Sequence, residues 1–144
     1  MKLTHVILYY PSMEKGGIEV NLRHLVKYFT NKGIKISLIS NKINTTGLGL
    51  NKKKFKLIKT DTKFTNSFLP YRLLTSLFSI KKLIKTIKNN KRENTVVFSM
   101  QSSMVSILVS KFYKTKIVAR NSEDPISSTV YADNYISSII VFFL

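Results

Sequence analysis

The sequence is short of the residues that build most covalent and metal sites. It contains no cysteine and only 2 histidines, and just 7 of its 144 residues are acidic. The lack of cysteine excludes disulfide bonds and cysteine-ligated zinc, and it agrees with a reducing compartment. Because His5 and His24 are too few for most histidine metal sites, we expect no metal. We expect no cofactor either. We see no secretory signal and no apolar run near the roughly 18 residues that span a bilayer, so we expect a cytoplasmic protein.

The shortage of acidic residues leaves a formal net charge of +17. Such a charge attracts the phosphates of nucleotides, nucleic acids or anionic lipids. Lys, Asn and Ile are abundant together, which is typical of an AT-biased coding sequence, so biased composition stays open as an alternative explanation. The basic residues lack the interleaved aromatics of a nucleic-acid-binding face, which argues against nucleic acid as a partner. Peripheral contact with an anionic membrane at its inner face remains open.

The first third of the chain has the pattern of a strand, a helix and a second strand. Residues 3–10 form a short apolar run, and residues 34–40 alternate apolar and polar side chains, so both indicate strands. Between them, residues 18–31 carry their apolar side chains on one helical face. Gly33 stands where a glycine cap ends a helix. This order predicts a right-handed βαβ unit.

The rest of the chain continues the alternation. We predict strands over residues 55–60, 95–100 and 116–120, and helices over residues 70–90 and 102–113. Several lysines surround the first of these strands, which is typical of a sheet edge. The alternation predicts an α/β fold, a Rossmann-like doubly wound parallel sheet in a single domain.

Glycine and polar residues follow the predicted strands, at what should be one edge of the sheet. Gly16 and Gly17 precede the first helix, whose free N–H groups favour a phosphate. Gln101 follows the strand at 95–100. The residues after the last strand have side chains that suit phosphate, carboxylate or sugar hydroxyls: Arg120, Asn121, Glu123 and Asp124. Ligands of open α/β sheets bind beyond the carboxyl ends of strands, so this edge is the candidate site.

Structural explanations of these segments stay open. The glycine pair can form a plain turn, the Asp124-Pro125 pair can form another, and the serines after Gln101 can cap a helix. The chain has neither G-x-G-x-x-G nor G-K-[ST], which argues against dinucleotide and P-loop functions. We expect His5 to be packed in its strand and His24 to lie at the surface, so neither is assigned as a catalytic base.

Residues 14–22 and 33–39 resemble the start of the GT-B retaining glycosyltransferases often called family 4. Members begin with a strand and a Gly-Gly loop, followed by an acidic residue two positions after the second glycine, as Glu19 is here. An amphipathic helix, a glycine and a hydrophobic strand then follow. Residues 117–125 are similar to the arginine-containing variant of a later motif, so the resemblance covers essentially the whole chain.

The resemblance implies transfer of a sugar, with retention, from a nucleotide-sugar donor to a lipid-linked acceptor or a growing polysaccharide. In such enzymes the N-terminal domain mainly binds the acceptor, and its Gly-Gly loop approaches the donor phosphates. The resemblance thus implies donor-phosphate contacts for Gly16 and Gly17. Acceptor contacts are then expected for the polar residues named above, which are Gln101, Arg120, Asn121, Glu123 and Asp124. No metal is typically required.

Two features depart from the family pattern. Many members have a histidine in the segment corresponding to residues 120–124, and none is present here, so the catalytic residue is unknown. The C-terminal domain with the donor pocket is also missing. We therefore interpret residues 1–144 as a single incomplete GT-B N-terminal domain, truncated and expected to be inactive alone. Two alternatives stay open: a stand-alone basic α/β module for anionic membrane or nucleic acid, and a non-functional remnant.

Overall fold

A computed structural model of the chain describes residues 2–11, 17–41, 54–60, 71–100 and 103–120. Within these residues, five strands form one sheet in the order β3-β2-β1-β4-β5, and all neighbouring strands are parallel. The strands are β1 (His5–Tyr9), β2 (Lys35–Ser40), β3 (Phe55–Lys59), β4 (Thr95–Ser99) and β5 (Lys116–Ala119). The helices are α1 (Gly17–Asn31), α2 (Tyr71–Lys88) and α3 (Ser103–Phe112), with a short 3₁₀ turn at Arg92–Asn94. The predicted Rossmann-like parallel α/β fold is confirmed.

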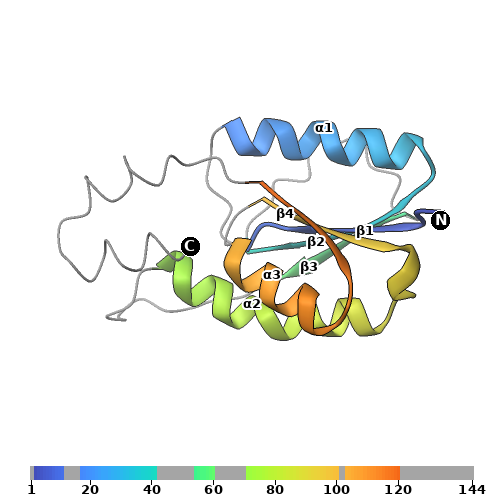
Figure 1. Cartoon of the computed structure of the whole chain (residues 1–144). Coiled ribbons are helices and arrows are strands. Elements are labelled where there is room, and N and C mark those ends of the chain that lie inside the picture. The colour runs from blue at the N-terminus through green and yellow to red at the C-terminus, as the bar shows by residue number, and fades with distance from the viewer. Residues whose placement is uncertain (1, 12–16, 42–53, 61–70, 101–102, 121–144) are drawn as a thin grey trace.

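The helices form layers on both faces of the sheet. Figure 1 shows α1 along one face and α2 and α3 along the other. The chain passes from β1 to β2 through α1, and later returns from β3 across the sheet to β4 through α2. The direction of winding therefore reverses between β1 and β4. This reversal is the topological switch point, beside which ligands of open α/β sheets bind.

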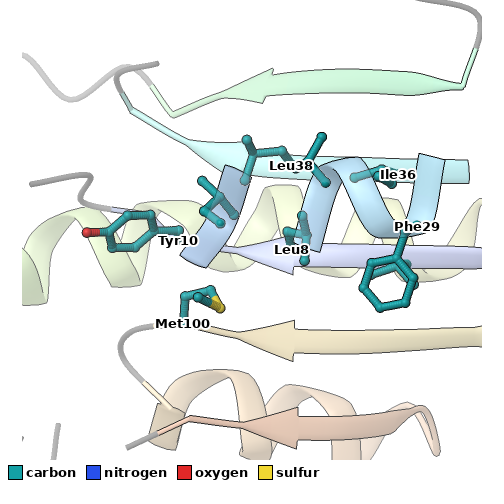
Figure 2. Close-up of a cluster of buried hydrophobic side chains, with 9 residues drawn as sticks. Leu8, Tyr10, Phe29, Ile36, Leu38 and Met100 are labelled. Carbon is teal, nitrogen blue, oxygen red and sulfur yellow. The ribbon is translucent and has the colours of Figure 1, made fainter. Parts of the chain in front are cut away.

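Side chains of the central strand β1 alternate between two apolar cores, as the period of a strand requires. The even-numbered side chains of β1 face α1, and Figure 2 shows Leu8 and Tyr10 together with Phe29 of α1. Ile7 and Tyr9 point to the other face, where they pack with Leu83 and Ile87 of α2. All five residues of β1 are buried, because both faces of this strand are covered.

The two edges of the sheet are more exposed than its centre. β3 is one edge strand, as its lysines predicted. β5 is the other edge, and it is mostly exposed. On the neighbouring helix α3, Leu108 and Phe112 are exposed too.

Gly33 ends α1 with a left-handed backbone, at a φ of 76°. Its N–H donates to the carbonyl of Thr30 at 3.0 Å, and the N–H of Ile34 donates to the carbonyl of Phe29 at 3.0 Å. These two bonds form a Schellman motif, so the predicted glycine cap is confirmed. A side chain at this position would be strained, since only glycine adopts such a φ freely.

Candidate functional site

The carboxyl ends of the strands meet at one edge of the sheet, which we call the carboxyl rim. Residues directly after the strands continue the backbone ladder there, among them Tyr10, Met100 and Arg120. The N–H of Tyr10 donates to Ile39, that of Met100 donates to Tyr9, and that of Arg120 donates to Ser99, at distances of 3.0, 3.0 and 2.9 Å. Tyr10, Met100 and Arg120 therefore lie side by side at the ends of β1, β4 and β5. Figure 2 shows Tyr10 and Met100 just beyond the arrowheads of their strands.

Gly17 is the first residue of α1, the helix that follows β1. Because the strands are parallel, the helices that link them run in the opposite direction, and α1 begins at the carboxyl rim. Its first N–H groups have no partner within the helix and favour negative charge. Glu19 in this first turn forms an ion pair with Arg23 at 2.8 Å. The acidic residue of the family resemblance thus has a local structural role here.

Arg120 is exposed at the end of β5, two strands away from β1. The predicted placement of Gly17 and Arg120 at one rim of a parallel sheet agrees with the structure. Their roles in ligand binding stay predictions. Five of the predicted site residues lie outside the described residues: Gly16, Gln101, Asn121, Glu123 and Asp124. How any of them lies relative to Gly17 or Arg120 is therefore not described either.

Polar side chains below the carboxyl rim serve the fold. The hydroxyl of Ser106 on α3 donates to that of Ser99 at the end of β4, at 2.7 Å, and both residues are buried. The hydroxyl of Thr60 donates to the carbonyl of Pro11 at 3.4 Å and links the ends of β3 and β1. The first bond fastens α3 to the end of β4, and the second links the ends of two strands. Both bonds hold the backbone at the carboxyl rim in place.

The two histidines occupy different surroundings, as predicted. His24 is exposed on α1. His5 is buried at the start of β1, where its Nε2 lies 2.9 Å from the hydroxyl of Ser37. Burial, and then the positive charge of Lys35, lowers the pKa of His5 from 6.5 to about 4. Since His5 lies at the amino end of its strand, it is far from the carboxyl rim and is no base for chemistry there.

Tyr9 is also buried, at the last position of β1. Burial raises the pKa of its phenol to about 12, although a hydrogen bond with Ser79 of α2 opposes this rise. The phenol is therefore neutral at physiological pH. It ties β1 to α2 and offers no charge to a ligand.

A cavity of about 650 Å³ lies at the opposite edge of the sheet, the amino rim, where the strands begin. We call it the lysine cavity. Its walls come from the starts of β1, β2 and β3 and from the second half of α2, and they carry five lysines: Lys35, Lys54, Lys56, Lys82 and Lys85. This site was not predicted from the sequence. Lysines at the starts of two predicted strands were the available signal; the structure shows that these strands are parallel neighbours, which places their first residues side by side.

The described part of the chain holds neither a metal cluster nor a membrane span. There, no three acidic or histidine side chains come together in a way that would hold a metal ion. No helix among those residues combines the length and the apolar character needed to cross a bilayer.

Solved structures share this architecture. The chain is similar to a glycosyltransferase from Rickettsia africae, with 20% identity and a TM-score of 0.58 over 94% of this chain and 35% of that one. It is similar to MurG from Acinetobacter baumannii, with 12% identity and a TM-score of 0.54 over 81% and 34% of the two chains. It is also similar to the C-terminal domain of a hydrogenase from Pyrococcus furiosus, with 12% identity and a TM-score of 0.62 over 83% and 92%. No protein-family model matches the sequence, and no curated protein matches it significantly.

These likenesses concern the fold. The chain has a glycosyltransferase-like, Rossmann-type α/β fold. At identities of 20% or less the likeness extends to the fold alone, and a hydrogenase domain has the same architecture. The chain spans about a third of the length of the glycosyltransferase and of MurG, at 35% and 34%.

Proposed function

We propose that the chain is the acceptor-side half of a sugar transferase, which moves a sugar from a nucleotide-sugar donor to a lipid-linked or glycan acceptor. One observation carries the proposal. Gly17 at the start of α1 and Arg120 after β5 lie at the same rim of an all-parallel sheet, on either side of the switch point between β1 and β4. That is where ligands of this fold class bind. The likeness to the Rickettsia africae glycosyltransferase supports it.

Gly17 and Arg120 have the chemistry that such a site needs. The N-terminal end of α1 offers N–H groups and a partial positive charge to the donor diphosphate, which becomes more negative as the sugar leaves. The guanidinium of Arg120 presents paired N–H donors that match phosphate or carboxylate oxygens on the acceptor. Gly16 belongs with Gly17 in this proposal. Gln101, Asn121, Glu123 and Asp124 supply partners for sugar hydroxyls.

The proposal assigns the donor pocket to a second domain. Sugar transfer needs the donor and the acceptor to be held together, and the carboxyl rim of one sheet supplies one wall of such a cleft. We therefore expect no sugar transfer by residues 1–144 alone, and robust turnover by the isolated chain would overturn this part. A lipid-linked acceptor places the protein at the inner face of the membrane, where its net charge of +17 favours contact with anionic lipid.

Replacing Arg120 with alanine is expected to weaken acceptor binding about tenfold, because a charge-assisted hydrogen bond to phosphate is lost. Farnesyl diphosphate serves as a short lipid-linked probe, and UDP-glucose and GDP-mannose serve as donor probes. In NMR titrations, the donors should shift the backbone amide of Gly17, and the acceptor probe should shift that of Arg120.

Lys111→Ala is the matched control, because Lys111 is an exposed cation on α3. This variant should bind farnesyl diphosphate as the parent chain does. If Arg120→Ala and Lys111→Ala weaken binding equally, the loss comes from the lower net charge of the chain. That result would contradict the role assigned to Arg120. If the titrations shift the amide signals of neither Gly17 nor Arg120, the binding site is not at the carboxyl rim.

A further inference from the structure

The lysine cavity is built by the register of the parallel strands. His5 starts β1, and its register partner on β2 is Lys35. Ser37, two positions further along β2, is opposite Lys56 on β3. Because side chains alternate along a strand, His5, Lys35 and Ser37 point to the same face of the sheet, and Lys56 joins them there. This is the face that α2 covers.

Helix α2 closes the cavity from the other side. Its residues Leu83 and Ile87 are buried against the sheet. Lys82 and Lys85 flank this buried stripe and line the cavity together with the polar side chains of the next turn, Thr86, Asn89 and Asn90. Sheet and helix thus bring four lysines to one hollow. A fifth, Lys54, stands at its edge, with its Nζ close to the backbone of Gly33.

Among the described residues, no carboxylate that lines the cavity balances this charge. The described lining residues include five lysines and no aspartate or glutamate. Within the described residues, the ion pair of the chain joins Glu19 to Arg23 on α1, and no carboxylate pairs with the lysines of the cavity. Like charges around one concave surface raise the local positive potential and concentrate anions there.

The size of the cavity limits the class of anion that it can bind. Its volume of about 650 Å³ is within the range of small-molecule sites. A single phosphate is small compared with this volume, whereas a chain of linked phosphates can extend between the lysines of the sheet and those of α2. Lysine is a compact cation that suits phosphate oxygens. We propose that the lysine cavity binds a soluble anion that carries two or more linked phosphate groups.

This site is distinct from the proposed transfer site. The lysine cavity lies at the start of the strands, and Gly17 and Arg120 lie beyond their ends. Neither of these two residues lines the cavity. The cavity is therefore an additional site, whatever occupies the carboxyl rim.

The test compares two pairs of substitutions that remove the same charge. Calorimetric titration of the chain with sodium tripolyphosphate should show binding. Lys35→Gln with Lys85→Gln should weaken this binding at least about tenfold, since each lysine contributes a close charge pair at a solvated site. The matched pair, Lys27→Gln with Lys111→Gln, removes two exposed cations outside the cavity and should change the affinity by no more than about twofold.

The NMR signals of the two histidines show where tripolyphosphate binds. His5 lines the cavity and His24 does not, so tripolyphosphate should shift the imidazole NMR signals of His5 and leave those of His24 in place. A second cavity pair, Lys56→Gln with Lys82→Gln, repeats the affinity test should the first pair disturb folding. The four lysines replaced in the two cavity pairs are all exposed, so both cavity pairs are expected to keep the native circular dichroism spectrum.

Three results would overturn the proposal. One is no measurable binding of tripolyphosphate, and another is equal loss of affinity in the cavity pair and the matched pair. The third concerns vesicles made of equal parts phosphatidylcholine and phosphatidylglycerol. If the cavity pair weakens binding to these vesicles and leaves tripolyphosphate binding unchanged, the lysines serve a lipid surface instead of a soluble polyphosphate.

Discussion

Replacing Leu8 with alanine is expected to lower the free energy of unfolding by about 2–5 kcal/mol. Leu8 is fully buried in the middle of β1 and packs in the core beneath α1. β1 is the central strand, with neighbours on both sides and helices on both faces, so the surrounding structure cannot collapse into the space left by the side chain. A loss of this size is a large part of the roughly 5–15 kcal/mol that stabilises a typical domain.

Urea denaturation followed by circular dichroism measures this loss. Leu108→Ala is the matched control, because it makes the same chemical change at a side chain that is 61% exposed on α3. The control should change the free energy of unfolding by no more than about 0.5 kcal/mol. Similar losses in the two variants would mean that β1 is not the buried centre of the sheet.

Lowering the pH from 7 to 4 is expected to remove about 3 kcal/mol of stability through His5 alone. The pKa of His5 is about 4 in the folded chain and 6.5 as its ordinary value. As the pH falls through 6.5, His5 becomes protonated in the unfolded chain but stays neutral in the folded chain. The neutral form therefore contributes its full stability above pH 6.5, and this contribution is lost progressively down to about pH 4.

The physical cause is the burial of the ring beside a fixed positive charge. His5 is 6% exposed, its Nε2 is engaged with Ser37, and Lys35 on the neighbouring strand repels a second cation. Its Nδ1 is buried and has no hydrogen-bond partner among the described residues. These surroundings therefore favour the neutral ring over the protonated one.

Denaturation by urea at several pH values tests this expectation. His5→Gln should flatten the fall in stability between pH 6.5 and 4, whereas His24→Gln should keep it, because His24 is exposed. The variants differ from the parent chain at one histidine each, so the difference between their pH profiles isolates the contribution of His5. Parallel pH profiles for the parent and His5→Gln would show that the ring is not buried neutral.

The order of the secondary structure was predictable because each element carries its own period. The apolar stripe of α1 and the buried run of β1 are local patterns, and Gly33 marked the end of the helix by a local rule. Several predicted ends agree with the structure, and the others differ from it by one or two residues. At Met100 and Arg120 the cause is visible, since their N–H groups still donate to the neighbouring strand after the regular strand has ended.

The strand order was not readable from the sequence. It depends on α2 carrying the chain from β3 across two strands to β4, and on the face of the sheet that this helix covers. No local pattern encodes that choice. The same limit hid the lysine cavity, because Lys35 and Lys85 are far apart in the sequence and meet only after the sheet and α2 have packed together.

The carboxyl rim was partly predictable. A parallel sheet brings the residues after its strands to one edge, so the sequence pattern alone assigns Gly17 and Arg120 to a common rim. Which of their neighbours touch a ligand depends on loop conformation, which sequence periodicity does not determine. Gln101 and Asn121 remain assignments of that kind.

The shortness of the strands sets how strongly events at the two rims influence each other. β1 has five residues, and at about 3.3 Å per residue the two rims are about 16 Å apart. Charges in physiological salt are screened over about 8 Å, and substitutions more than about 10 Å apart usually act additively. Ligands bound at the two rims should thus act independently of each other, and combined substitutions at Lys35 and Arg120 should show no coupling.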